Sequence, residues 1–234
     1  MRFPGKTKRP YTAAVIAAAG ASRRMGSDKL FADLGGAPVL LRTLEAFEAS
    51  GRIDEIVLVA REDRLSELYR LTQESGLQKL RAIVAGGESR TVSVQNGVAA
   101  VSPQTQLLCI HDGARPFVPG ALIARVLEEA ALWGAATAAL PAQNTIKSAD
   151  AQGFVAATPP RDTLWEIQTP QGFRLELYRE AMRRFPGEYT DDCAPLEAMG
   201  RRVRLVEGER RNIKLTTPED LLTAQLFWET EGAR

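Results

Sequence analysis

The sequence predicts an α/β fold with a mostly parallel, twisted sheet that carries helices on both faces. Three observations support this prediction. Short apolar runs rich in β-branched residues alternate with segments whose apolar residues recur at helical spacing. Three unusual loops, 19–29, 86–90 and 112–116, each follow a predicted strand, and parallel sheets bind ligands beyond the carboxyl ends of their strands. After Pro141 the alternation stops and a hairpin pattern begins.

The first predicted strand spans 13–19 and leads into a turn of small residues at 20–22. Small side chains let a ligand approach the backbone N–H groups, and a turn of such amides binds anions. Three cations follow: Arg23, Arg24 and Lys29. The loop lacks the G-K-S/T and G-x-G-x-x-G patterns of known phosphate loops. It therefore indicates either a polyphosphate site or a plain strand-to-helix turn with solvated arginines.

The middle of the chain repeats the strand–helix unit. A helix is predicted over 39–50, because Leu40, Leu44 and Phe47 share one face, and Gly51 ends it. Further strands are predicted at 55–60, 81–85, 107–111 and 135–140, and further helices at 65–71, 91–101 and 122–133. Such an order predicts right-handed crossovers between parallel strands.

Residues 141–168 follow a different pattern. Two short runs, 145–149 and 154–158, flank a turn at 150–153 and predict a β-hairpin. Prolines make the next segment, 158–162, stiff and extended. A strand is predicted at 164–168, after which 169–173 returns to the body of the domain. An inserted hairpin either lies on the surface or projects as a dimer-forming arm, and we expect the arm.

The remaining elements complete a single domain over 11–234, preceded by a basic tail, 1–10. Helices are predicted at 174–184 and 192–199, with residues 190–192 as caps, and a strand at 203–206. Thr217 is a suitable N-cap with Pro218 at the first helical position, so the last helix begins there and runs to about residue 230.

Composition narrows the class of protein. The chain has 234 residues with 30 basic and 29 acidic side chains, and this balance argues against a nucleic-acid surface. The sequence contains neither a membrane-length apolar run nor a secretory apolar region. Cys109 and Cys193 are too few for a disulfide framework, and a single histidine, His111, leaves almost no basis for a histidine metal site. A reduced, cytoplasmic setting is the simplest expectation.

The loops form a recognisable set, in this order: AAAGASRRMGSDK, VAGGESRTVSV, IHDGARPFV, RDTLWEIQTPQGF, TDDCAPLEAMG and NIKLTTPEDL. They cover nearly the whole chain, which resembles the 2-C-methyl-D-erythritol 4-phosphate cytidylyltransferase family of non-mevalonate isoprenoid biosynthesis. The resemblance implies a Rossmann-like nucleotidyltransferase fold with an inserted β-arm, at about 141–168, that forms a homodimer. It also implies CTP and methylerythritol phosphate as substrates, Mg²⁺ as cofactor, and the CDP-alcohol and pyrophosphate as products.

The resemblance assigns roles by position. The residues matched to catalysis are Arg24, Lys29 and Lys214. Those matched to nucleotide binding are Ala18, Ala19, Gly20, Ala21, Ser22, Gly87, Glu88, Arg90, Ser93, Asp112 and Gly113. Those matched to the sugar phosphate are Arg115, Thr145, Arg161 and Thr190, of which Thr145 and Arg161 reach across the dimer. Two roles are open for Asp112: it contacts the metal or the nucleotide, or it caps its own turn.

The expected chemistry is direct in-line attack of a phosphate oxygen on the α-phosphorus of CTP. The nucleophile is already an anion, so repulsion between phosphates is the main obstacle, and cations offset it. Arg24, Lys29 and Lys214, with Mg²⁺, supply that charge, while Arg115 and Arg161 hold the incoming phosphate. His111 is more often a satisfied strand-end histidine than a catalyst, and Cys109 is a core residue.

Two alternatives stay open at this point. The family usually has Arg-Asp-Thr in the arm where this chain has Gln143-Asn144-Thr145, so another polyol phosphate, such as ribitol 5-phosphate, is the nearest rival substrate. A non-catalytic nucleotide-binding module is the rival from another class, and the three catalytic cations argue against it. A dehydrogenase fits poorly, because its glycine fingerprint is missing.

Overall fold

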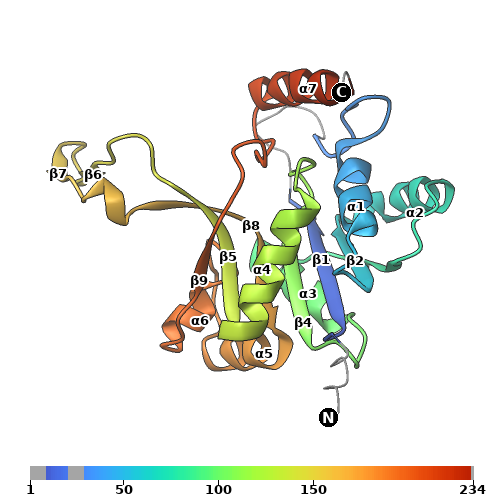
Figure 1. Cartoon of the computed structure of the whole chain (residues 1–234), viewed down its shortest axis with the longest axis horizontal. Helices are drawn as coiled ribbons and strands as arrows, with labels where there is room; N and C mark the ends of the chain where they lie inside the picture. Colours follow the sequence, from blue (N-terminus) through green and yellow to red (C-terminus); the bar gives the residue numbers. More distant parts are fainter. Residues whose placement is uncertain (1–8, 21–28, 233–234) are drawn as a thin grey trace, which may run out of the picture.

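The computed structural model describes residues 9–20 and 29–232, and a seven-stranded sheet forms the centre of this part (Figure 1). The strand order is β3-β2-β1-β4-β8-β5-β9. The strands are β1 (Thr12–Ala18), β2 (Glu55–Ala60), β3 (Leu80–Ala85), β4 (Leu107–Asp112), β5 (Ala135–Pro141), β8 (Trp165–Arg174) and β9 (Arg204–Glu207). Only β8 runs antiparallel to its sheet neighbours among these strands, so the prediction of a mostly parallel sheet is confirmed.

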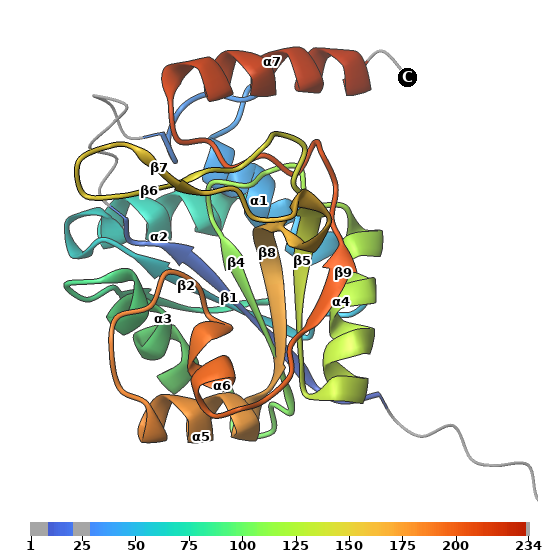
Figure 2. The ribbon, with the colours of Figure 1, turned by 90° about the vertical axis from the view of Figure 1, so that its left-hand side faces the viewer.

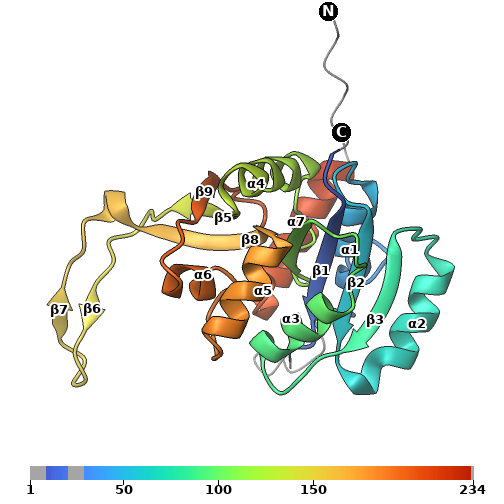
Figure 3. The same cartoon turned by 90° about the horizontal axis from the view of Figure 1, so that it is seen from below.

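Helices cover both faces of the sheet, as Figures 2 and 3 show. They are α1 (Val39–Ala49), α2 (Leu65–Glu74), α3 (Arg90–Ala99), α4 (Gly120–Trp133), α5 (Leu175–Arg184), α6 (Ala194–Ala198) and α7 (Pro218–Gly232). Buried apolar residues of α1, α2, α7 and one side of α4 belong to one core cluster, and those of α3, α5 and α6 belong to a second. The other buried residues of α4 form a third, smaller cluster with β5 and β9. Within the described residues, none of these helices has the length and apolarity to span a bilayer.

The central strands β1 and β4 divide their side chains between the first two of these clusters with a period of two. In β1, Ile16 faces the core of α1 and α4, whereas Val15 faces the core of α3 and α5. In β4, Cys109 and Ile110 alternate in the same way. This pattern explains why the central strands are apolar throughout, since both faces of a parallel sheet are buried. The expectation that Cys109 is a core residue is confirmed by its lack of exposed surface.

The strand β8 differs from the sequence prediction. A strand at 164–168 and a returning segment at 169–173 were expected, but one strand runs from Trp165 to Arg174 between β4 and β5. Pro170 lies where the register with β5 shifts between Thr137 and Ala139. The missing N–H of proline therefore interrupts no ladder pair, which is how a proline is accommodated inside a sheet.

The predicted hairpin is present and projects from the body of the domain (Figure 1). Its strands, β6 (Ser148–Ala149) and β7 (Val155–Ala157), are shorter than expected, and a 3₁₀ turn, η2 (Arg161–Thr163), interrupts the segment predicted as extended. The side chains of Phe154 and Val155 are 71% and 63% exposed. Large apolar groups at such exposure suggest an interaction surface on this hairpin.

Thr217 and Asp191 cap helices as predicted, whereas Asp192 does not. Thr217 caps α7 as predicted: its Oγ1 accepts the Asp220 N–H at 3.3 Å, and the Asp220 carboxylate accepts the Thr217 N–H at 2.8 Å. Asp191 accepts the N–H of Ala194 at the start of α6. Asp192, which was also predicted as a cap, instead pairs with Arg90, and α6 is correspondingly shorter than predicted.

Candidate functional site

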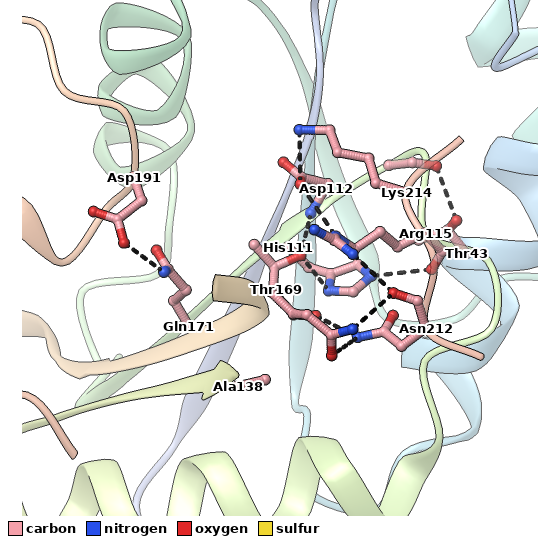
Figure 4. Close-up of polar contacts among 12 residues, drawn as sticks. Thr43, His111, Asp112, Arg115, Ala138, Thr169, Gln171, Asp191, Asn212 and Lys214 are labelled. Carbon is pink, nitrogen blue, oxygen red and sulfur yellow. Dashed lines mark hydrogen bonds and ion pairs between the residues drawn. The ribbon is translucent and has the colours of Figure 1, made fainter. Parts of the chain in front are cut away.

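The candidate site lies at the carboxyl edge of the sheet, where β4 ends in Asp112. Three cations contact the Asp112 carboxylate. We call Asp112 and these three residues, Arg90, Arg115 and Lys214, the Asp112 cluster. Lys214 Nζ lies 2.9 Å from Oδ2, Arg115 Nε lies 3.4 Å from Oδ2, and Arg90 Nη2 lies 3.5 Å from Oδ1. Figure 4 shows Lys214 and Arg115 converging on Asp112 from different segments of the chain.

The charges of the cluster fix its protonation state. Burial alone would raise the pKa of the Asp112 carboxyl, but the three cations outweigh it and hold that pKa well below its ordinary value. Although burial acts to lower it, the pKa of Arg90 is raised by the carboxylates of Asp192 and Asp112. Three positive groups therefore face two carboxylates, Asp112 and Asp192, and the remaining positive charge suits the cluster to an anionic ligand.

The loop that carries Arg90 packs tightly against β1 because it contains glycine. A Cβ at Gly86 would lie 2.3 Å from the Ala19 Cβ, and a Cβ at Gly87 would lie 2.2 Å from the side chain of Val92. Ser89 caps α3 by accepting the Val92 N–H at 3.1 Å. Ser93 Oγ accepts the Gly87 N–H at 3.0 Å and donates to the Ser89 carbonyl. Loop 86–90 is thereby held beside the end of β1.

A buried carboxylate extends the cluster toward a second loop. Arg90 donates to both oxygens of Asp192 at 3.0 and 2.7 Å, a bidentate pair. Gln171 on β8 accepts the Asp192 N–H at 2.9 Å and donates to Asp191 at 3.1 Å. The loop containing Thr190 is therefore tied both to the sheet and to the loop at 86–90.

The loop at 112–115 is anchored from several directions. Gly113 N–H donates to the Ala17 carbonyl of β1 at 2.9 Å, and Thr43 of α1 donates to the Gly113 carbonyl at 2.9 Å. Leu215 N–H donates to the Ala114 carbonyl at 2.9 Å, which docks the segment carrying Lys214 onto this loop. Ion pairs of fixed geometry require such a rigid backbone.

The structure brings together some of the predicted site residues and places others elsewhere. Arg90, Asp112, Arg115 and Lys214 converge, beside the strand end that carries Ala18, Ala19 and Gly20 and near Gly87, Ser93 and Gly113. Ala21, Ser22 and Arg24 lie outside the described residues. Lys29 is the first described residue after that gap, is half-buried, and accepts the Ala32 N–H through its carbonyl.

Four predicted residues lie away from the cluster or at its margin. Thr145 and Arg161 are exposed on the projecting hairpin, where Arg161 donates to the Gln143 carbonyl at 3.0 Å. Glu88 and Thr190 are exposed in the two loops joined by the Arg90–Asp192 pair.

Sequence reasoning missed three polar residues that support the site: Thr169, Asp192 and Asn212. Thr169 accepts the Asp112 N–H at 3.1 Å, and Asn212 donates to the Thr169 carbonyl at 2.8 Å. The Asn212 carbonyl in turn accepts from Arg115 at 2.8 Å. Their positions in the sequence could have indicated them, because each lies in one of the loop motifs. Asp192 and Asn212 are two residues from Thr190 and Lys214, which were assigned to the site, and Thr169 precedes Pro170.

Three features define the class of protein as a nucleotide-using transferase. They are the parallel sheet with loops at its carboxyl edge, the Asp112 cluster that suits an anionic ligand, and the small-residue sequence that follows β1. Comparison with known proteins places the chain within that class. A family model of 2-C-methyl-D-erythritol 4-phosphate cytidylyltransferase matches residues 12–230, and the chain belongs to this family. This confirms the resemblance indicated by the sequence motifs.

Individual relatives agree over nearly their whole length. A curated cytidylyltransferase of this name from Desulforamulus reducens is 44% identical over 220 residues, which cover 92% of this chain and 94% of the relative. One from Dehalococcoides mccartyi is 45% identical over 215 residues, with coverages of 92% and 94%. The crystal structure of 4-diphosphocytidyl-2C-methyl-D-erythritol synthase from Anaerococcus prevotii has a TM-score of 0.85 at 32% identity, covering 94% and 99% of the two chains.

Proposed function

We propose that this chain transfers the cytidylyl group of CTP to 2-C-methyl-D-erythritol 4-phosphate and releases pyrophosphate. Family membership defines the reaction class, and the Asp112 cluster is the observation of this chain's own structure that carries the proposal. Lys214, Arg90 and Arg115 converge from three separate segments on one carboxylate. A protein that merely stabilised its fold would have little use for three converging cations, two of which, Arg90 and Lys214, keep part of their side chains exposed.

The proposed step is a direct displacement on the α-phosphorus. The phosphate of the sugar attacks as an anion, the α-phosphorus–oxygen bond to pyrophosphate breaks, and no proton has to be removed first. The groups that lower the barrier are therefore cations, which stabilise the negative charge gathered in the transition state. We assign this role to Lys214 together with Arg24 and Lys29, and we assign Arg115 and Arg161 to the incoming phosphate.

We further propose that Asp112 takes part in holding Mg²⁺ with the phosphates of CTP. The carboxylate remains ionised, and within residues 9–20 and 29–232 its Oδ1 has only the long 3.5 Å contact with Arg90. Among the described residues there is no cluster of three or more potential metal ligands. Magnesium is commonly bound by one or two carboxylates plus substrate phosphates rather than by a protein cage. The ion would neutralise triphosphate charge, and EDTA should abolish turnover.

The hairpin is proposed as the dimerisation arm, with Thr145 and Arg161 completing the partner's sugar-phosphate site. Supporting observations are its projection from the domain and the exposure of Phe154 and Val155 at its tip. Nucleic acid and membrane are not proposed as partners. We propose a cytoplasmic location, in keeping with two buried free thiols, Cys109 and Cys193.

A substrate panel tests the proposed function. Each of the four nucleoside triphosphates is incubated with methylerythritol phosphate or ribitol 5-phosphate, and pyrophosphate release is followed. We expect turnover with CTP and methylerythritol phosphate at a kcat/KM at least tenfold above every other pair. Faster turnover with ribitol 5-phosphate would reassign the alcohol, and no pyrophosphate from any pair would indicate a non-catalytic binding protein.

A further inference from the structure

The only histidine of the chain lies directly behind the Asp112 cluster and is joined to it by three consecutive hydrogen bonds. The Asp112 N–H donates to Thr169 Oγ1 over 3.1 Å. Thr169 Oγ1 lies 3.0 Å from His111 Nδ1, and His111 Nε2 lies 3.1 Å from the Arg115 carbonyl oxygen. Figure 4 shows the ring between the Thr169 side chain and the loop that carries Arg115.

The directions of these bonds follow from the groups at the two ends. A backbone N–H only donates and a carbonyl oxygen only accepts. His111 Nε2 must therefore carry a hydrogen, because otherwise two acceptors would face each other at 3.1 Å. Thr169 Oγ1 already accepts from Asp112, which leaves its own hydrogen for the lone pair of His111 Nδ1.

The surroundings of the ring agree with a neutral imidazole. His111 has no exposed surface, and its ring packs against Phe47 with centroids 4.9 Å apart. Burial of a charged ring is unfavourable when its two nitrogens face a hydroxyl and a carbonyl group instead of a carboxylate. The ring thus matches one tautomer, protonated at Nε2.

We propose that His111, as the Nε2-protonated tautomer, is a positioning residue that orients the Thr169 hydroxyl and fixes the backbone of Asp112 and Arg115. The ring lies on the α1 side of β4, whereas Asp112 is the next residue and points to the cations. His111 therefore acts through its neighbours without contacting the reactants. Because β4 and β8 are separate segments, the ring also holds two strands of the site in one relative position.

The effect of His111 on turnover rests on the proposed function, whereas the tautomer of its ring can be measured independently of that function. A protein labelled with ¹⁵N-histidine contains one imidazole, so its two ring nitrogens are assigned without ambiguity. We expect Nε2 to show the chemical shift of a protonated nitrogen and Nδ1 that of an unprotonated, hydrogen-bonded one. A ring protonated at Nδ1 alone, or one exchanging rapidly between tautomers, would overturn the proposal.

Three substitutions then test positioning in the folded enzyme. His111→Gln keeps a donor near the Nε2 position, His111→Asn keeps a polar group near Nδ1, and His111→Leu removes both bonds. Small displacements of reacting groups reduce turnover steeply, so we expect His111→Leu to lower kcat at least tenfold with a smaller change in the KM for CTP. His111→Gln or His111→Asn should recover a measurable part of that loss.

Cys109→Ala is the matched control, because Cys109 lies on the same strand, faces the same core and is equally buried. It should lower the melting temperature while leaving kcat near the wild-type value. A His111→Leu enzyme with unchanged kcat, or one whose kcat loss is matched by Cys109→Ala, would contradict the proposal. If the wild-type chain turns over none of the tested pairs, the proposed function fails while the tautomer measurement still decides the geometry.

Discussion

Lys214 and Asp112, which lie in widely separated parts of the sequence, form an ion pair with 2.9 Å between Nζ and Oδ2. The pair exists because the segment 212–215 is docked onto the loop after β4 through the Leu215–Ala114 hydrogen bond. Lys214 is 39% exposed at its side chain, so its charge remains accessible to a ligand.

Lys214→Ala should lower kcat by about 10² or more, because removal of one preorganised transition-state charge typically has that effect. The same loss is expected for Lys29→Ala and for Arg24→Ala. Steady-state pyrophosphate release measures it, with Arg204→Ala as a control on the far strand β9, where the arginine contacts Glu129 at 3.4 Å. A loss below threefold in the three variants would mean that other cations perform the step.

Gly86→Ala should raise the KM for CTP at least tenfold with a modest change in melting temperature. The new Cβ would lie 2.3 Å from the Ala19 Cβ, so the loop at 86–90 must move away from β1. Gly187→Ala is the control, since its nearest neighbour would be the Tyr189 hydroxyl at 3.6 Å, an ordinary contact. Equal KM values for the two variants would show that this loop is not part of the nucleotide site.

Asp192→Asn should weaken CTP binding and destabilise the protein. It leaves Arg90 without its bidentate partner, and breaking a buried pair usually costs about 3–5 kcal/mol, reduced here to about 1–3 kcal/mol because the Arg90 side chain is 30% exposed. Urea unfolding measures the loss. Glu129→Gln, which removes an exposed ion pair with Arg204, should change stability by less than about 1 kcal/mol. Similar losses in both variants would contradict this account of the pair.

Phe154→Glu should convert a dimer into a monomer, because it places a charge in the exposed apolar tip of the arm. Sedimentation velocity at several concentrations measures the change, and turnover should fall with it, since Arg161 is proposed to serve the partner's site. Tyr69→Glu is the matched control: Tyr69 is 60% exposed on α2, away from the arm. A wild-type chain that sediments as a monomer would remove the basis of this prediction.

The cap of α7 should make stability depend on acidity. Burial acts to raise the pKa of Asp220, but hydrogen bonds from Thr216 and Thr217 outweigh it and lower that pKa below its unfolded value of 3.8. The stabilisation is therefore complete above about pH 4 and is lost as the pH falls through the lower, folded pKa. Asp220→Asn should melt below the wild type at pH 7, and the difference should shrink toward pH 3. A difference in melting temperature that stays constant from pH 7 to pH 3 would show that ionisation of Asp220 does not contribute to stability.

Local signals made much of the site predictable. A run of β-branched residues followed by a loop of small or charged residues marks the end of a strand. Because parallel strands end at one edge of the sheet, the loops that contain Arg90 and Asp112 are predicted to lie at the same edge. The motif resemblance added Lys214, which no local pattern distinguishes from an ordinary surface lysine. The strand β8 was only partly predicted, because the register shift that accommodates Pro170 depends on its partner β5.

The sequence by itself determined the α/β class, the order of most strands and helices, the projecting hairpin and the residue types needed for phosphate chemistry. These follow from periodicity and loop composition, which are local properties of the chain. Only the tertiary structure decided that Asp192 pairs with Arg90 instead of capping α6, and that His111 and Thr169 support Asp112 from behind. Partners from distant segments are fixed by strand order and register, and a polar side chain carries no local record of which of them it will meet.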